Sequence, residues 1–221
     1  SDQKYVDAGC IIAEKKELFE RAGMIIKVKE PLEEEYNFFR EEQILYTYLH
    51  LAANKELAKV LLEKKIYGVA YETVMEEDGT LPLLKPMSEI AGRLSVQEGA
   101  KYLEKPFGGR GILLGGVPGI ARGKITILGG GVVGTNACKI AVGIGAEVTI
   151  LDLSARRLGY LDDIFGSAIT TLYSNDANIE ESVAGADLVI GAVLIPGAAA
   201  PKLIRKEHLK TMKQGAVIVD V

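Results

Sequence analysis

The chain is poor in cysteine and histidine, with two of each among its 221 residues. Cys10 and Cys138 lie far apart in the sequence, and neither belongs to a CxxC pair or a Cys/His cluster with metal-ligand spacing. We therefore expect no metal site. A reduced intracellular compartment, the cytoplasm, fits this cysteine usage best.

Basic residues are not in excess, because 26 lysines and arginines stand against 30 aspartates and glutamates, a net charge of -4. The long-range field that gathers phosphate backbones is then absent, so nucleic acid is not an expected partner. Apolar runs of the roughly 18 to 20 residues that a bilayer span needs are also lacking. Hydrophobic residues nevertheless make up 48% of the chain, enough to bury a sizeable core.

The two ends of the sequence have no terminating signals. The chain opens on Ser1 in a pattern typical of a helix, without an initiator methionine, and closes on the apolar strand 216–220 with no turn after it. We therefore expect a chain that is truncated at both ends. A targeting peptide could belong to the missing front piece.

The first part of the chain alternates short apolar runs with helical patterns. Strands are predicted at 24–28, 43–49 and 67–71, and helices near 13–21, 32–40 and 54–64. This order is typical of a parallel α/β sheet, so residues 1–85 are expected to form a partial substrate or catalytic domain. Residues 86–122 are expected to bridge two domains through a helix from Ser88 to about Glu104. The glycine-rich stretch 108–119 that follows it is predicted to be a linker or an ordered loop near a ligand.

A second alternation fills residues 123–221. Strands are predicted at 124–128, 147–151, 168–173, 187–191 and 216–220, and helices at 132–144, 154–164, 177–183 and 201–211. The fold class is therefore α/β, with two Rossmann-like domains that have parallel sheets. The second is a doubly wound dinucleotide-binding domain, incomplete at its C-terminus.

The strand 124–128 leads directly into a GxGxxG pattern at Gly129, Gly131 and Gly134. The pattern is weak alone, but here a helix follows it and a second strand ends in Asp152 about twenty residues later, as dinucleotide binding requires. Gly129 permits the tight turn and Gly131 lets the backbone approach a pyrophosphate. Gly134 lets helix and strand pack closely, with the positive helix end facing the phosphates.

Asp152 favours NAD over NADP, because its carboxylate can accept hydrogen bonds from ribose hydroxyls and repels a 2′-phosphate. Arg156 and Arg157 follow closely and could accept that phosphate, but they also fit the exposed face of a helix. The predicted cofactor is NAD.

Two further segments have open interpretations. The loop 191–197 follows a buried strand and either lines the cofactor or is an ordinary connection. Ser88 stands where a helix N-cap belongs, and capping is favoured over phosphate binding.

The two histidines differ in their surroundings. His208 has charged neighbours on a predicted surface helix and is expected to be solvated. His50 follows an apolar strand, where α/β sites form, and is either a satisfied core histidine or a proton-transfer group. Lys27 and Lys29 fall on the same side of a strand end, so one or both could hold a substrate carboxylate, or both are simply exposed.

The sequence as a whole resembles the alanine dehydrogenases, along essentially its full length. The resemblance lies in the stretches Lys27–Pro31, Tyr46–Ala53, Ala70–Thr73, Leu81–Leu84, Pro86–Glu89, Gly108–Gly111, Gly115–Gly119 and Gly191–Gly197. That family interconverts L-alanine with pyruvate and ammonia using NAD, as homohexamers in many bacteria. The resemblance implies the same small-molecule substrates and a homo-oligomer here.

The resemblance also implies roles for single residues. His50 would be the catalytic acid/base and Lys29 the substrate-binding lysine. The NAD contacts would come from Ser88, Asp152, Arg157 and Ser174 and from the backbone around Val132, Val133, Val193 and Leu194.

Two elements of the family pattern are missing. The family has an arginine that binds substrate in an N-terminal strand and a catalytic aspartate in an Asp-Gln-Gly-Gly run, and neither is in this sequence. These residues alone could therefore be inactive. The alternatives are the NAD(H)-binding component of a proton-translocating transhydrogenase, which has no histidine at the position of His50, and a non-catalytic NAD-binding module.

Overall fold

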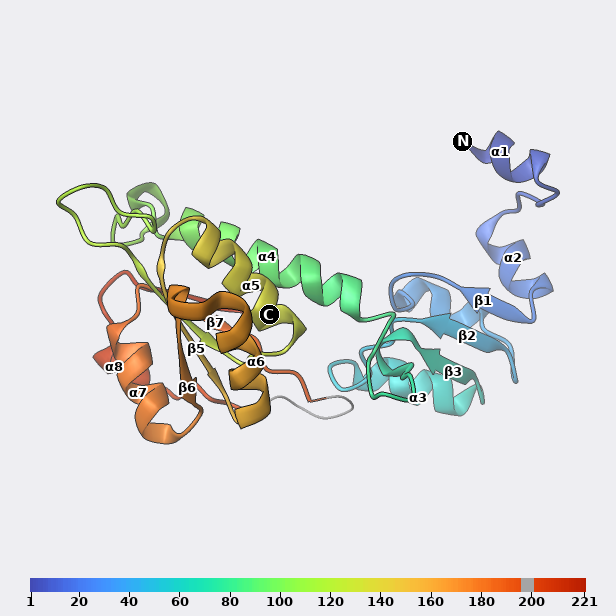
Figure 1. Cartoon of the computed structure of the whole chain (residues 1–221). Helices are drawn as coiled ribbons and strands as arrows, with labels where there is room; N and C mark the ends of the chain where they lie inside the picture. The colour runs from blue at the N-terminus through green and yellow to red at the C-terminus, as the bar shows by residue number, and fades with distance from the viewer. Residues whose placement is uncertain (196–200) are drawn as a thin grey trace. The chain divides into compact units, whose positions relative to one another are not determined.

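The computed structural model describes residues 1–195 and 201–221 (Figure 1). The chain divides into two compact units, one of residues 1–84 and one that contains residues 85–195 and 201–221. Each unit is built on its own sheet, and all strand pairs in both sheets are parallel. The predicted α/β fold with two parallel sheets is confirmed.

The first unit contains a three-stranded sheet of order β1-β2-β3. Its elements are α1 (Asp2–Asp7), α2 (Lys15–Arg21), β1 (Met24–Ile26), η1 (Glu33–Phe38), β2 (Ile44–Thr47), α3 (Lys55–Glu63), β3 (Tyr67–Ala70) and η2 (Tyr71–Thr73). The helix predicted near 32–40 is a 3-10 helix. It starts at Glu33, with Leu32 as its N-cap, and the Glu35 side chain accepts a hydrogen bond from the Leu32 N–H, which tightens the first turn.

One face of this sheet carries the core of the first unit. Alternation along the strands turns Ile25 and Leu45 inward and leaves Met24 and Ile26 exposed. The buried cluster contains Phe19, Ile25, Phe39, Leu45, Leu49, Leu57 and Leu61. Helix α3 contributes through Leu57 and Leu61, which are four residues apart and so share one helical stripe.

The second unit contains a five-stranded sheet of order β6-β5-β4-β7-β8. Its elements are α4 (Lys85–Tyr102), η3 (Lys105–Phe107), β4 (Lys124–Leu128), α5 (Val132–Gly143), β5 (Glu147–Asp152), α6 (Ala155–Phe165), η4 (Gly166–Ala168), β6 (Ile169–Tyr173), α7 (Asp176–Gly185), β7 (Leu188–Gly191), α8 (His208–Thr211) and β8 (Val217–Asp220). The strand order reverses between β4 and β7, and this switch point is where α/β sheets form their ligand crevice.

Both faces of the five-stranded sheet are covered. Ile127 and Ile150 pack with residues of α4, α5 and α6, including Val96, Ala137 and Leu161. On the other face Leu128, Leu151 and Val189 pack with Ile179 and Val183 of α7. The second unit is therefore doubly wound, as the sequence predicted.

Helix α4 packs tightly on α5. A Cβ atom placed on Gly92 would lie 2.2 Å from the carbonyl oxygen of Val133, so only glycine fits at this crossing. A Cβ atom on Gly99 would overlap the side chain of Leu188 in the sheet. The helix therefore belongs to the second unit and covers its sheet.

The glycine-rich stretch is an ordered loop at the amino edge of the second sheet. The backbone N–H of Arg110 donates to the carbonyl oxygen of Gly215 at 3.0 Å, and its guanidinium pairs with Asp187 at 2.9 Å. Lys213 also pairs with the buried Asp187 carboxylate, at 3.0 Å. Asp187 directly precedes β7, so this cluster lies at the edge opposite the carboxyl ends, where ligands bind.

Three sequence predictions in the second unit are wrong. Ser88 does not cap α4, because the helix already begins at Lys85, with Pro86 in its first turn, where the missing N–H costs nothing. The helix predicted over 201–211 is limited in the described residues to the one turn of α8. His208 is buried rather than solvated, because its ring turns inward from that turn and its Nδ1 accepts the Arg205 N–H.

In residues 1–195 and 201–221, no helix combines the length and apolar character needed to cross a membrane.

Candidate functional site

The turn between β4 and α5 can be built only with glycine at two of its positions. Gly129 has a φ of 103°, and a Cβ atom on it would lie 2.7 Å from the carbonyl oxygen of Ala192. A Cβ atom on Gly134 would lie 1.8 Å from the carbonyl oxygen of Gly129, which is an impossible contact. The turn is thereby drawn tightly against the ends of both central strands.

Gly131 differs from these two, because a Cβ atom on it would meet nothing within 4 Å. It is the N-cap of α5, and no side chain caps the helix. Among the residues that the structure describes, the backbone N–H groups of Gly131, Val132 and Val133 have no hydrogen-bond partner. Free donors at the positive end of a twelve-residue helix, beside an open space at Gly131, fit a pyrophosphate group.

Asp152 ends β5 and fixes the glycine turn from the side. Its Oδ2 atom accepts the N–H of Gly130 at 2.7 Å, and its Oδ1 atom accepts the N–H of Ser154 at 2.8 Å. Each carboxylate oxygen can accept a second hydrogen bond, so Asp152 retains capacity for a ribose hydroxyl. The side chain is half-buried, which leaves it accessible to a ligand at the edge of the sheet.

Arg157 also holds the glycine turn. Its guanidinium donates hydrogen bonds to the carbonyl oxygens of Gly130 and Gly131 and to the hydroxyl of Thr135. From its residue type and position alone, Arg157 was expected either to bind a 2′-phosphate or to lie on the exposed face of a helix. In the structure its guanidinium is instead hydrogen-bonded to the glycine turn. Arg156, its neighbour, is exposed.

Three further predicted cofactor residues, Ser174, Val193 and Leu194, lie at the carboxyl edge of the same sheet. The backbone N–H of Ser174 donates to the carbonyl oxygen of Asp152 at 3.0 Å, which brings Ser174 next to the end of β5. Val193 and Leu194 follow β7, and Leu194 is exposed. Residues 196 and 197 of the predicted 191–197 loop lie outside the described residues.

A pocket of about 510 Å³ opens at the carboxyl ends of β4, β7 and β8. It is lined by Leu128, Gly191, Val193, Pro201, Lys202, Leu203, Ile204, Arg205, Lys206, Leu209, Ile218 and Asp220. Of the predicted cofactor residues it contains Val193, so the loop after β7 does line a cavity. The pocket lies on the β7 and β8 side of the switch point.

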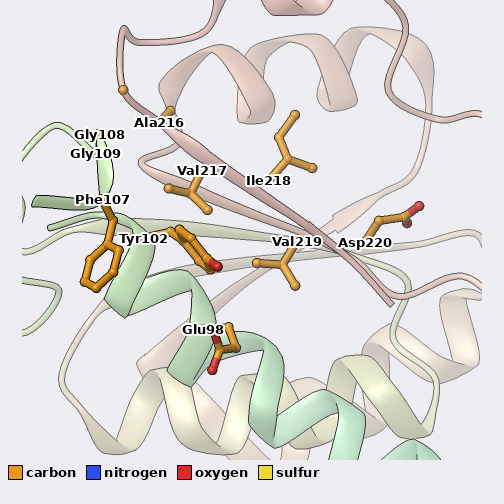
Figure 2. Close-up of a pocket in the computed structure, with 11 residues that line it drawn as sticks. Glu98, Tyr102, Phe107, Gly108, Gly109, Ala216, Val217, Ile218, Val219 and Asp220 are labelled. Atoms are coloured by element: carbon orange, nitrogen blue, oxygen red, sulfur yellow. The ribbon is translucent and has the colours of Figure 1, made fainter.

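A second cavity, of about 570 Å³, lies between β8 and α4. Figure 2 shows Val217 and Val219 pointing from β8 toward α4, with Ile218 on the opposite side of the strand. None of the predicted site residues lines this cavity. It is therefore separate from the cofactor site.

His50 lies in the first unit, shortly after β2. Its side chain is 51% exposed, so it is not a core histidine, and that alternative is wrong. Its φ of 48° is in the left-handed region, which costs energy for a residue with a side chain and is common at functional sites. Glu72 supports this conformation, because its carboxylate accepts the N–H groups of His50 at 2.8 Å and of Leu49 at 3.1 Å.

The imidazole of His50 contacts a second carboxylate, since its Nδ1 atom lies 3.1 Å from Oε2 of Glu30. The backbone N–H of Glu30 and the contact with His50 hold the pKa of Glu30 below its usual value of 4.5. The ring of Tyr48 is stacked parallel to the imidazole, with centroids 6.0 Å apart. Burial, with Glu72 nearby, raises the pKa of Tyr48 above 10.0, so its hydroxyl stays protonated.

The two lysines after β1 have different partners. Lys27 is half-buried and forms an ion pair with Glu35, so it is not available for a substrate. Lys29 is exposed, and no ion pair involving it is found within the described parts of the chain. Its carbonyl oxygen accepts the hydroxyl of Thr47 at 2.8 Å, which fixes its backbone at the end of the sheet. Of the two candidates, Lys29 is the one whose ammonium can meet an anion.

Sequence reasoning missed three residues of these sites. Glu30 and Glu72 lie inside stretches that carried the family resemblance, but their contacts with His50 were not predicted. Thr135, which binds Arg157, looked like an ordinary helix residue. One sequence signal was available for the two glutamates. Each follows shortly after a strand that is a neighbour of β2, and the carboxyl ends of parallel strands lie at one edge of a sheet.

In the described residues, no group of three or more His, Cys, Asp or Glu side chains is placed to hold a metal ion. Both cysteines are free thiols. Cys138 is buried, and burial raises its pKa to about 12, so it is unreactive at neutral pH.

A doubly wound parallel sheet, a glycine turn with free helix N–H groups and a carboxylate at the end of the second strand define the class of dinucleotide-binding α/β domains. Comparison with known families agrees. The model for "Alanine dehydrogenase/PNT, N-terminal domain" matches residues 1–91, and that for the C-terminal domain matches residues 95–221. The chain belongs to the alanine dehydrogenase/PNT family.

Similar proteins cover the whole chain. An alanine dehydrogenase of Methanococcus maripaludis is 62% identical over 222 residues, and one of Bacillus subtilis is 61% identical over 221 residues. Both alignments include 100% of this chain, which spans 60% and 58% of the length of these two relatives.

Solved structures show the same fold. One titled L-alanine dehydrogenase has a TM-score of 0.87 at 55% identity, over 100% of this chain and 61% of its own. A transhydrogenase from Sinorhizobium meliloti has a TM-score of 0.76 at 24% identity, over 98% of this chain and 63% of its own, and shares the fold.

Proposed function

We propose that the full-length protein catalyses the reversible oxidative deamination of L-alanine to pyruvate and ammonia, with NAD as cofactor. Identity of about 60% to alanine dehydrogenases along the whole chain supports this reaction. The second unit would bind the cofactor, and the first unit would supply the groups that act on the substrate.

The glycine turn is the proposed pyrophosphate site. The N–H groups of Gly131, Val132 and Val133 would hold the phosphates, and Asp152 would accept a ribose hydroxyl. The negative charge of Asp152 and the engagement of Arg157 with the turn both favour NAD over NADP. Ser88, Arg157, Ser174, Val193 and Leu194 remain proposed contacts. Bound NAD would supply the hydride acceptor.

His50 and Lys29 are the proposed substrate groups. The ammonium of Lys29 would hold the carboxylate of alanine or pyruvate. The imidazole of His50 would take a proton from the substrate nitrogen during deamination and return one in the reverse reaction. The observation that carries the proposal is the position of His50, a partly exposed imidazole held by two glutamates at the sheet edge that also carries Lys29.

The test is NADH formation from L-alanine and NAD at alkaline pH, followed by absorbance. The protein at its full encoded length is compared with its His50→Ala variant and with the 221-residue chain. The variant is expected to lose at least about a thousandfold in kcat while its affinity for NADH, measured by fluorescence, stays within about twofold. Unchanged NADH binding serves as the control for folding of the cofactor site.

Other outcomes would support the alternatives. Full-length protein that binds NADH but ignores alanine would overturn the proposal. Hydride transfer to a second nucleotide would then indicate a transhydrogenase component, and no transfer at all would indicate a non-catalytic NAD-binding module. If the full-length protein is active and the 221-residue chain is not, residues outside this chain are needed for turnover.

The family relationship and the cysteine usage lead us to propose two further properties. The full-length protein would work in the cytoplasm, and it would assemble as a homohexamer. Light scattering on the full-length protein tests the assembly, and a mass of one or two protomers would contradict it.

A further inference from the structure

Two glutamates in the first unit have no role in the proposed reaction, yet both contact His50. Glu30 lies shortly after β1, His50 shortly after β2 and Glu72 shortly after β3. The three strands are neighbours in one parallel sheet, so their carboxyl ends bring these residues to one edge. This arrangement places one carboxylate on the ring of His50 and the other on its backbone.

The contact with Glu30 determines which ring nitrogen carries hydrogen. An ionised carboxylate can only accept hydrogen bonds, and the low pKa of Glu30 keeps it ionised at neutral pH. Since Nδ1 of His50 lies 3.1 Å from Oε2 of Glu30, the hydrogen must be on Nδ1. In the neutral ring Nε2 is then unprotonated and can accept a proton from a substrate.

The contact with Glu72 determines where the ring stands. The left-handed conformation of His50 is unfavourable for a residue with a side chain, so something must hold it. The Glu72 carboxylate accepts the N–H groups of two successive residues, Leu49 and His50. Leu49 is also buried in the core of the first unit, so the bend is fixed on two sides.

We propose that Glu30 is a positioning residue, which holds the imidazole of His50 with its hydrogen on Nδ1 and thereby presents Nε2 to the substrate. Glu72 contributes to the same positioning, because its carboxylate holds the backbone N–H groups of Leu49 and His50. The inference rests on the proposed function for its catalytic consequence. The hydrogen position itself is a property of the protein alone and can be measured without turnover.

Kinetics test the catalytic part with the full-length protein. Glu30→Ala is expected to lower kcat with alanine about 10- to 100-fold, the usual loss when a group that orients a working histidine is removed. The KM for NAD should stay within about twofold, because the cofactor residues are in the other unit. Glu30→Gln should recover most of the loss, since its amide oxygen can still accept from Nδ1.

The matched control is Glu33→Ala, which removes an exposed glutamate of the same segment. It should leave kcat unchanged. A double variant separates positioning from general stability: if Glu30 acts through His50, adding Glu30→Ala to His50→Ala costs no further rate. An additional loss of the size seen in the single Glu30→Ala variant would overturn the proposal.

The hydrogen position is read by solid-state ¹⁵N NMR on full-length protein labelled at histidine, at a pH where the ring is neutral. The signals of His50 are identified as those missing in His50→Gln. The expected spectrum has His50 protonated on Nδ1 in the wild type and in Glu30→Gln, and no longer fixed on Nδ1 in Glu30→Ala. If the wild type carries its hydrogen on Nε2, or Glu30→Ala changes nothing, the inference is wrong. Because this result needs no alanine turnover, it fails independently of the proposed function.

Discussion

The backbone N–H of Gly130 donates a hydrogen bond of 2.7 Å to Oδ2 of Asp152, which joins the glycine turn to the end of the neighbouring strand. The carboxylate that is expected to select NAD is therefore also part of the frame of the turn. Its two oxygens accept two different backbone N–H groups, of Gly130 and Ser154. Cofactor affinity and the shape of the turn should depend on the same side chain.

Asp152→Asn is expected to weaken NADH binding about 10- to 100-fold. An asparagine turns an N–H₂ group toward one of the two backbone donors, so one charge-assisted hydrogen bond is lost and a donor is left unpaired. Fluorescence titration of NADH measures the loss. Asp163→Asn, which changes an exposed aspartate of α6, is the control and should bind NADH like the wild type. Equal affinities for wild type and Asp152→Asn would show that NADH binding does not depend on this carboxylate.

Alanine substitutions at two glycines of the turn should have different effects, one on the stability of the fold and the other on NADH binding. Gly134→Ala should lower the free energy of unfolding by about 3 kcal/mol or more, because its Cβ would overlap the Gly129 carbonyl. Gly131→Ala should unfold like the wild type but bind NADH at least about tenfold more weakly, since the methyl group fills the space left for phosphate. Urea unfolding and NADH titration measure the two effects.

The control for this pair is Gly143→Ala in the same helix, where a Cβ atom meets nothing within 4 Å. It should be neutral for NADH and stabilising by up to about 1 kcal/mol, because alanine is the better helix former. If Gly131→Ala binds NADH normally, the phosphates do not approach the backbone at this turn.

The ion cluster at the opposite edge of the second sheet should contribute to stability without affecting the cofactor. Asp187→Asn leaves Arg110 and Lys213 without their buried partner and should cost about 2 kcal/mol in the free energy of unfolding. Glu147→Gln breaks an exposed pair with Lys124 and should cost less than about 0.5 kcal/mol. Urea midpoints measure both. A loss of NADH affinity in Asp187→Asn folded protein would contradict this separation.

The first unit should become less stable in acid because of Glu35. Burial alone would raise its pKa, but hydrogen bonds from Lys27 and from the Leu32 N–H lower it below 4.5 overall. A group with a lower pKa in the folded than in the unfolded state stabilises above the unfolded value, and this contribution is lost as pH falls through the folded value. Stability should therefore decline below about pH 4.5.

Urea midpoints between about pH 6 and pH 3 measure this decline. Glu35→Gln cannot titrate and should show a flatter acid limb, whereas Glu33→Gln, an exposed control, should follow the wild type. Parallel curves for the wild type and Glu35→Gln would assign the acid loss to other carboxylates.

The cofactor half of the site was largely readable from the sequence. Gly129, Gly131, Gly134 and the helix that begins at Val132 are consecutive or nearly so, and local backbone geometry alone makes them a tight turn at a helix N-terminus, the arrangement expected of a phosphate site. Asp152 follows at the end of the next strand, at a distance set by one helix and one strand. The strand pattern and the doubly wound sheet were predicted for the same reason, since alternation and helical periodicity are local properties.

The surroundings of the two histidines were not readable. Charged neighbours suggested that His208 is solvated, but the structure buries it. For His50 the sequence left a core position and a proton-transfer role both open, and only the structure shows that its side chain is 51% exposed. Burial depends on which way a side chain turns at the end of an element. That direction is decided by packing against residues far away in the chain.

The sequence by itself determined the fold class, the glycine turn and the position of an acid at the end of the second strand, because neighbours along the chain encode them. Only the tertiary structure decided three contacts. Arg157 donates hydrogen bonds to the glycine turn, Lys27 forms an ion pair with Glu35, and Glu30 contacts the ring of His50. These contacts join residues from different strands and helices. They exist because parallel strands bring their carboxyl ends to one edge, a relation in space that the order of residues does not state.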